Sequence, residues 1–152
     1  MTLSFLYETI FSRVRGKIYD PKELSLNPDD LVEVYTERLH SVVSDPRIRK
    51  LFSSIEFDDE IQTMTCELSH SVDEQSDIDF IIELFSIGMI IEWLEPQVNS
   101  IVMTGFYLGG KEEKKLLDNH KYNIDRLQTL KTQQHKMIRD YNSMYNSYVL
   151  GE

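Results

Sequence analysis

The apolar residues at the start of the chain recur at helical spacing. Between residues 3 and 17 they stand three or four positions apart, which predicts an amphipathic helix with one buried face. The apolar positions of that face are Leu3, Leu6, Tyr7, Ile10, Phe11 and Val14. The next stretch, YDPKELSLNPDD, contains several turn-forming residues and predicts a loop.

Two helix starts follow this loop. Asn27 can cap a helix, Pro28 suits the first helical position, and the two aspartates after it favour the positive end of the helix dipole. We therefore expect a second helix from residue 28 to about residue 43. Asp45 and Pro46 repeat the same signals and predict a short third helix.

Helical spacing is lost between residues 55 and 74. Within this segment QTMTCEL alternates, with Met64, Cys66 and Leu68 on one side and polar residues on the other. The alternation predicts either one short strand or an extended arm. The polar loop after it contains Ser76, followed three residues later by an aspartate, which resembles a capping box at the start of the next helix.

Residues 78–94 are apolar on almost every side of a helix. Several carboxylates lie in or beside this stretch, whereas a membrane span needs about twenty mostly apolar residues with few charges, so we reject a membrane span. A helix that is apolar all round is a buried central one. Pro96 is expected to kink or end it. The predicted core residues are Phe85, Ile90, Trp93, Leu94 and Pro96.

The last part of the chain predicts a connector and then a long helix. SIVMTGFYLGG is interpreted as a connector anchored by Phe106 and Tyr107, and the helix as running from Lys111 to about Tyr148. Its end is rich in tyrosine and methionine, a composition typical of interfaces. We predict that this helix docks on a partner; the alternative is that it folds back on the core. The predicted partner-binding residues are Leu127, Leu130, Met137, Ile138, Tyr141, Met144, Tyr145 and Tyr148.

Together these elements predict a mainly α fold. We expect a small helical bundle around a buried central helix, a short extended or β segment, and the long C-terminal helix. A chain of 152 residues with 41% apolar residues fits one domain. Within it, residues 1–110 form the helical core and residues 111–152 a docking arm of the same domain. Cys66 is the only cysteine, which excludes an intrachain disulfide and suits a reducing cytoplasm, or a particle assembled there.

Charge and motifs narrow the function classes. The net charge is −10, and the segment between Lys50 and Lys111 has twelve carboxylates but no lysine or arginine. This argues against a nucleic-acid-binding face and suggests a solvated acidic surface, or one that lies near DNA without adhering to it. The four histidines match no zinc-site spacing, and Cys66, four residues before His70, is interpreted as structural. We expect no catalytic residue, no cofactor and no metal site.

The junction MIIEWLEPQVNS followed by FYLGGKEEKKLLDNHKYNIDRLQTL resembles the head–tail connector (neck adaptor) proteins of siphophages from Gram-positive hosts. The resemblance covers about residues 78–140 and also includes the stretch at residues 119–131. A basic stretch associated with the extended segment of that family is absent here, where IEFDDEIQTMTCEL is acidic. The matching single residues are Glu92, Trp93, Leu94, Pro96, Asn99, Tyr107 and Leu108.

The resemblance implies a virion structural protein that assembles in the host cytoplasm. It would form a homo-oligomeric ring beneath the portal protein and contact a head-closure or tail-side neck protein. Genomic DNA would pass through the lumen without specific binding, and no membrane would be involved. Two other classes stay open. One is an acidic cytoplasmic regulator that binds a basic partner protein. The other is an enzyme or ligand-binding domain with a pocket beside Trp93 and Phe85.

Overall fold

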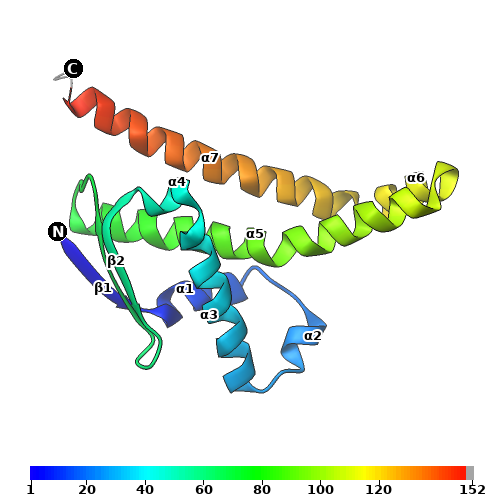
Figure 1. Ribbon diagram of the computed structural model, residues 1–152, viewed down its shortest axis with the longest axis horizontal. Helices are drawn as coiled ribbons and strands as arrows, with labels where there is room; N and C mark the ends of the chain where they lie inside the picture. Colours follow the sequence, from blue (N-terminus) through cyan, green and yellow to red (C-terminus); the bar gives the residue numbers. More distant parts are fainter. Residues whose placement is uncertain (150–152) are drawn as a thin grey trace.

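The computed structural model describes residues 1–149, with side chains as far as Ser143, and confirms the mainly α fold. Seven helices and a small sheet make up this part of the chain (Figure 1). The elements are β1 (Thr2–Leu6), α1 (Tyr7–Arg15), α2 (Pro21–Leu24), α3 (Pro28–Ser44), α4 (Pro46–Arg49), β2 (Phe52–Asp58), β3 (Thr63–Leu68), α5 (Glu74–Leu108), α6 (Gly110–Asn119) and α7 (Lys121–Val149).

Helix α5 is the buried centre of the fold, as the sequence predicts. Its middle turns are almost completely buried, and α1, α3 and α7 pack around it. The helix is capped by Asp73, three residues before the predicted cap Ser76, because the carboxylate of Asp73 accepts the Ser76 backbone N–H at 2.8 Å. It also continues through Pro96 to Leu108, so the predicted connector is helical instead. Figure 1 shows α5 bending in its middle part.

The three strands form an antiparallel sheet in the order β1-β3-β2. The predicted strand is its central one. Cys66 lies between Leu3 and Ile55 of the two outer strands, which makes an apolar row across the sheet. The predicted helix at residues 3–17 is therefore wrong at its start, where residues 2–6 pair with β3. Leu3 fits the spacing of apolar residues in a helix and also their alternation in a strand. The pairing with β3 selects the strand.

Helix α3 crosses α5 at a glycine. A Cβ atom on Gly88 would lie 2.7 and 2.8 Å from the two methyl carbons of Val42, so the close approach of the helices needs the missing side chain. The predicted start of α3 is confirmed, because the Asn27 side chain accepts the Asp30 N–H at 2.8 Å. The start of α4 is confirmed in the same way by Asp45.

The chain turns back after α5 and runs beside it to the C-terminal end (Figure 1). Gly109 and Gly110 have φ values of +65° and +60°, a conformation that favours glycine, and they reverse the chain. The predicted single helix from Lys111 is divided at His120, which separates α6 from α7. Residues 102–119 comprise the end of α5, the glycine turn and α6. We call this segment the α5–α6 hairpin.

Candidate functional site

The predicted partner-binding stripe faces α5. Leu127, Ile138 and Tyr141 are buried in the chain's own core, whereas Leu130 and Met137 are half-buried against it. The structure thus shows the second of the two alternatives, in which the terminal helix folds back, at least as far as Tyr141. Buried side chains are not available to a partner in this conformation. The remaining residues of the stripe lie outside the residues whose side chains are described: Met144, Tyr145 and Tyr148.

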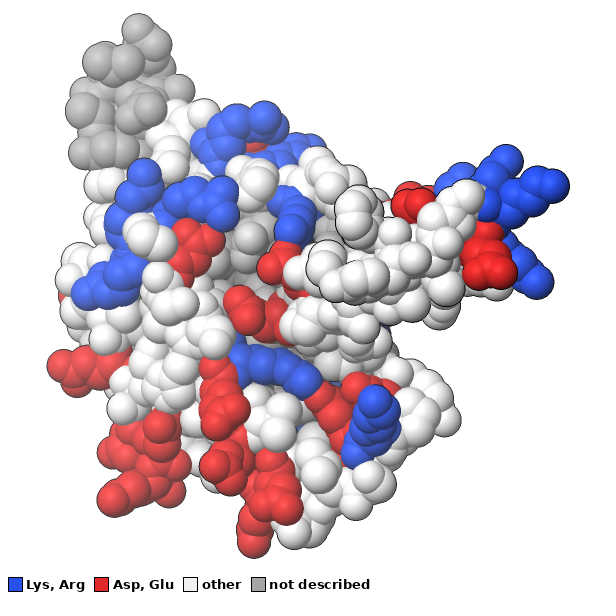
Figure 2. Space-filling model, turned by 45° about the vertical axis from the view of Figure 1, so that its right-hand side comes forward, with Lys and Arg blue, Asp and Glu red and all other residues white. Residues whose placement is uncertain are grey.

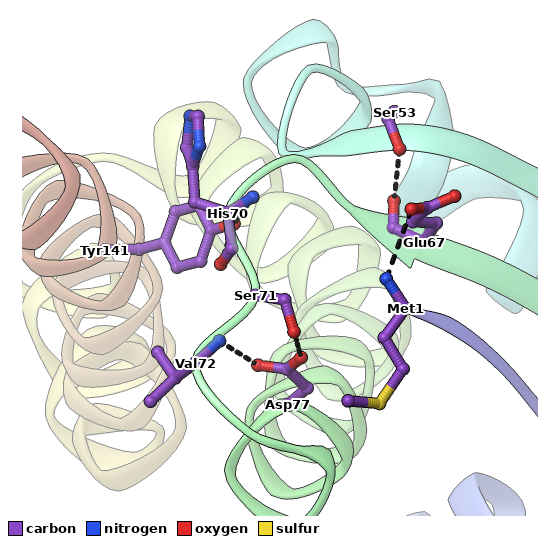
Figure 3. A network of polar contacts seen from close by, with 8 residues as sticks. All are labelled: Met1, Ser53, Glu67, His70, Ser71, Val72, Asp77 and Tyr141. Carbon is purple, nitrogen blue, oxygen red and sulfur yellow. Dashed lines mark hydrogen bonds and ion pairs between the residues drawn. The ribbon is translucent and has the colours of Figure 1, made fainter. Parts of the chain in front are cut away.

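Tyr141 fixes α7 to the segment between β3 and α5 (Figure 3). Its hydroxyl donates to the backbone carbonyl of His70 at 2.9 Å and accepts the His70 N–H at 2.8 Å. Its ring stacks on Phe80 of α5 with the ring centres 5.0 Å apart. Beside it, the buried carboxylate of Asp77 accepts the Ser71 hydroxyl and the backbone N–H of the next residue. These contacts make the region a structural joint.

The predicted core is correct at four positions. Phe85, Ile90, Trp93 and Leu94 are buried, and all belong to one apolar cluster. Pro96 is exposed, so its placement in the core was wrong. Since proline has no N–H, it is tolerated more easily on a solvent-facing side of a helix than within a packed face.

Trp93 is held by the segment between α1 and α3. Its indole N–H donates to the carboxylate of Asp20 at 3.0 Å, and the guanidinium of Arg126 lies 5.9 Å from the centre of its ring. Arg126 also donates to the backbone carbonyl of Lys17 at 2.7 Å. The side chain therefore has a structural role, in which α2 and α7 are both tied to α5.

The most exposed apolar surface lies at the end of α5. Phe106 and Tyr107, predicted as buried anchors, are 77% and 82% exposed. The side of Gly105 is covered, because Leu116 and the Glu113 side chain of α6 pack there. The sequence signal was an apolar cluster before two glycines, and periodicity alone did not show that no other element covers it. The α5 tip is defined here as Val102, Met103, Phe106, Tyr107 and Leu108, all of them exposed.

The α5 tip stands away from the body of the molecule. Figure 1 shows the α5–α6 hairpin projecting beyond the sheet and the other helices. In Figure 2 it forms an arm with a largely uncharged surface and charged side chains at its end. The exposed lysines of this end are Lys111, Lys114 and Lys115. The hairpin thus carries large apolar side chains that the rest of the described chain leaves exposed.

A polar cleft of about 330 Å³ lies between α3, α5 and α7. Glu95 and Lys131 form an ion pair across it at 2.5 Å, and Glu92 is a second carboxylate in its wall. Burial, followed by repulsion from Glu95, raises the pKa of Glu92. Neither Trp93 nor Phe85 lines this cleft, so it is a different place from the pocket considered beside them.

Three polar side chains meet at the turn between β2 and β3. The Tyr7 hydroxyl donates to Asp59 at 2.6 Å, and His40 Nε2 lies 2.9 Å from the same carboxylate oxygen. The His40 ring also packs against Phe57, with 4.6 Å between ring centres. Burial and the neighbouring carboxylate raise the pKa of Tyr7. A phenol with a raised pKa stays protonated, so the cluster fixes the turn to α1 and α3.

Other candidate chemistry is limited in the part of the chain that the structure describes. Burial raises the pKa of the Cys66 thiol to about 11, so the thiol stays protonated at neutral pH. Within residues 1–149, no three histidine, cysteine, aspartate or glutamate side chains gather closely enough to hold a metal ion. Two carboxylates of the acidic segment have structural partners, since Glu83 pairs with Arg13 and Asp73 caps α5.

Acid is expected to destabilise the fold through four aspartates. In each, a donated hydrogen bond is the main cause of a pKa below the usual value, which is about 3.9 in unfolded chains. A group with a lowered folded pKa stabilises the protein above its unfolded pKa, and this contribution is lost as pH falls through the folded pKa. The four residues are Asp20, Asp45, Asp59 and Asp73.

Urea unfolding at a series of pH values measures this effect. We expect these groups to change the free energy of unfolding little between pH 7 and about pH 5, and to lower it below about pH 4. Asp59→Asn should make the acid loss smaller, whereas Asp125→Asn, an exposed control on α7, should not. Identical acid profiles for Asp59→Asn and the unmodified protein would contradict the role given to the Tyr7 and His40 contacts.

Comparisons complete the description of the site. None of the helices in residues 1–149 is both long and apolar enough to cross a membrane. Family models, curated proteins and solved structures were all compared with the chain, and none of them matches it. The likeness to phage connector proteins therefore stays a prediction that rests on the residues named for it, among them Trp93, Tyr107 and Leu108.

Proposed function

We propose that this chain is a structural subunit of a tailed-phage virion, a head–tail connector that forms a ring beneath the portal. The observation that carries the proposal is the α5 tip, where large apolar side chains are exposed on a projecting hairpin. Contiguous exposed apolar surface is typical of sites that bind another protein. The docking element moves from the predicted stripe on α7, whose described members are covered, to the α5–α6 hairpin.

The size of the α5 tip indicates what kind of assembly it supports. Covering one large apolar side chain is worth about 1.5–3 kcal/mol, so Phe106 and Tyr107 together supply about 3–6 kcal/mol before costs. Association itself costs about 4–15 kcal/mol. Phe106 and Tyr107 together therefore support a weak pairwise contact. Such a contact becomes stable when many copies bind one template, as subunits of a ring on a portal do.

A ring also needs two different faces on each subunit, because its contacts are head-to-tail. The α5 tip is one such face. A second surface, on and beside α2 and below α5 in Figure 1, offers the exposed apolar side chains of Leu24 and Leu26, followed by the carboxylates of Asp29 and Asp30. This second surface differs in chemistry from the tip, as a heterologous contact requires.

The acidic regulator is the second candidate, and a specific observation favours it. Carboxylates gather on the lower part of the face in Figure 2, where little lysine or arginine is visible between them. A basic protein could bind such a surface with strong salt dependence. The exposed carboxylates of α3 and of the region around the β2–β3 turn are Asp29, Asp30, Glu33, Glu37, Asp58, Asp59 and Glu60.

Quantitative peptide mass spectrometry of purified, DNA-filled virions tests the proposal. We expect the chain in particles at a copy number equal to or close to that of the portal protein. The variant Phe106→Ser/Tyr107→Ser should be lost from particles, although its urea unfolding stays within about 0.5 kcal/mol of the unmodified protein, as for other exposed positions. Tyr19→Ser, which changes an exposed aromatic residue elsewhere, should be retained.

Two results would count against the connector. If the chain is abundant in infected cells and missing from particles, the acidic regulator becomes the better function. If the tip variant enters particles as well as Tyr19→Ser does, the hairpin is not the docking element.

A further inference from the structure

A groove between α4 and α7 concentrates positive charge in an acidic protein. It has a volume of about 310 Å³, and no carboxylate lines it, whereas the whole chain carries a net charge of −10. We call it the basic groove. Its lining residues are Arg47, Lys50, His135, Ile138, Arg139, Asn142 and Ser143.

The cations of the groove are only partly neutralised. Arg47 pairs with Asp45 at 2.9 Å. The carboxylate of Asp140 lies 3.8 Å from the Arg139 guanidinium, which is a long distance for an ion pair. Among the described residues, no carboxylate lies within ion-pair distance of Lys50. At least one full positive charge, and part of two others, therefore faces solvent in the groove.

One contact orients the groove's arginine. Arg47 Nη1 lies 2.9 Å from His135 Nε2. Because a guanidinium can only donate, Nε2 accepts and carries no proton in this contact. Arg47 is thus held from two sides, by His135 of α7 and by Asp45 at the start of α4. Asp45 accepts the N–H of Nε and one N–H of Nη2, and His135 accepts one of Nη1, so two of the five guanidinium N–H donors are left for a phosphate oxygen.

We propose that the basic groove binds phosphate groups of a DNA backbone. Arginine and lysine supply charge-assisted donors to phosphate oxygens, and the amide of Asn142 and the hydroxyl of Ser143 supply neutral ones. Contacts to phosphate oxygens carry no sequence information directly, so we expect binding that is independent of sequence. The choice of DNA over another phosphate source rests on the proposed function, in which the genome passes the subunit.

The basic groove could not be predicted from local sequence patterns. Its cations are Arg47 and Lys50 near α4 and Arg139 on α7, which are far apart in the chain and meet only because α7 folds back over α4. Figure 2 shows lysine and arginine side chains gathered on the upper part of the molecule and carboxylates on the lower part. A few cations within an acidic surface would hold DNA weakly and locally. DNA could then be guided without being trapped.

Fluorescence anisotropy with a labelled double-stranded DNA of twenty base pairs tests the proposal on the purified full chain. We expect binding at 50 mM NaCl that weakens with salt, with a slope of about −2 to −3 for three phosphate contacts. Lys50→Glu/Arg139→Glu should weaken binding by about ten-fold or more. Lys111→Glu/Lys115→Glu makes the same change of net charge on α6 and should weaken it by less than about three-fold, since these lysines lie outside the groove.

Circular dichroism and urea unfolding establish that both double variants are folded. Absence of DNA binding at 50 mM NaCl, or equal losses in both variants, would overturn the proposal. So would binding of inorganic phosphate to the groove, seen as shifts of its amide signals in NMR, without any binding of DNA. Salt-sensitive self-association that needs Lys50 and Arg139, again without DNA binding, would assign the groove to the acidic face of a second copy. None of these results depends on the presence of the chain in virions, so the two proposals fail separately.

Discussion

Phe85→Ala is expected to lower the free energy of unfolding by about 4 kcal/mol, within the 3–5 kcal/mol usual for a buried phenylalanine. Phe85 is completely buried in the middle of α5, and its ring lies 5.9 Å from that of Phe52 on β2. It therefore joins the central helix to the sheet. Domains of this size are stable by only about 5–15 kcal/mol, so the loss is a large share of the total.

Urea unfolding followed by circular dichroism measures this loss, and Phe106→Ala is its matched control. The same substitution at the exposed tip of the same helix should cost no more than about 0.5 kcal/mol. Equal losses at the two positions would mean that the α5 tip is covered within the monomer. A loss below about 1 kcal/mol at Phe85 would mean that α5 is not the centre of the core.

Tyr141→Ala is expected to lower the free energy of unfolding by about 3 kcal/mol, at the lower end of the range for aromatic residues. The substitution removes the stacking on Phe80 and both hydrogen bonds to the His70 backbone. Tyr141→Phe keeps the ring and should cost only about 1 kcal/mol. The difference between the two variants separates the ring from its hydroxyl.

Hydrogen exchange followed by mass spectrometry locates the effect. In Tyr141→Ala, we expect peptides from residues 134–143 to exchange faster while peptides from residues 81–94 stay protected, because α5 has other partners. Rapid exchange of residues 134–143 in the unmodified protein would mean that α7 is undocked in solution. In that case Leu127, Ile138 and Tyr141 would again be available to a partner, as the sequence analysis predicts.

Local signals predicted the elements that depend on local chemistry. Asn27 and Asp45 cap the helices that they were expected to start, and the apolar run around Phe85 is the buried centre. β1 and β2 were missed because their formation depends on pairing with β3, which is distant in sequence. Pro96 was expected to kink or end the helix, and it does not end it, since the packing of α5 before and after Pro96 outweighs one missing hydrogen bond.

The candidate site was harder to predict than the fold. Leu127 and Phe106 are both apolar residues on helices, and nothing in their local sequence says which is covered. Exposure depends on where α7 lies after the glycine turn, a long-range outcome. The basic groove was missed for the same reason, because Lys50 and Arg139 meet only after the chain has folded back. Periodicity identifies apolar faces, and tertiary packing decides which of them a partner can reach.

The continuity of α5 has a mechanical consequence. Its 35 residues correspond to about 52 Å of helix, so one continuous helix connects the core to the exposed tip. A force applied to the α5 tip would be transmitted to the sheet through this helix and not through loops. The helix is least stabilised at Pro96, where one backbone hydrogen bond is missing. The ion pair between Glu95 and Lys131 connects α5 to α7 directly beside that position.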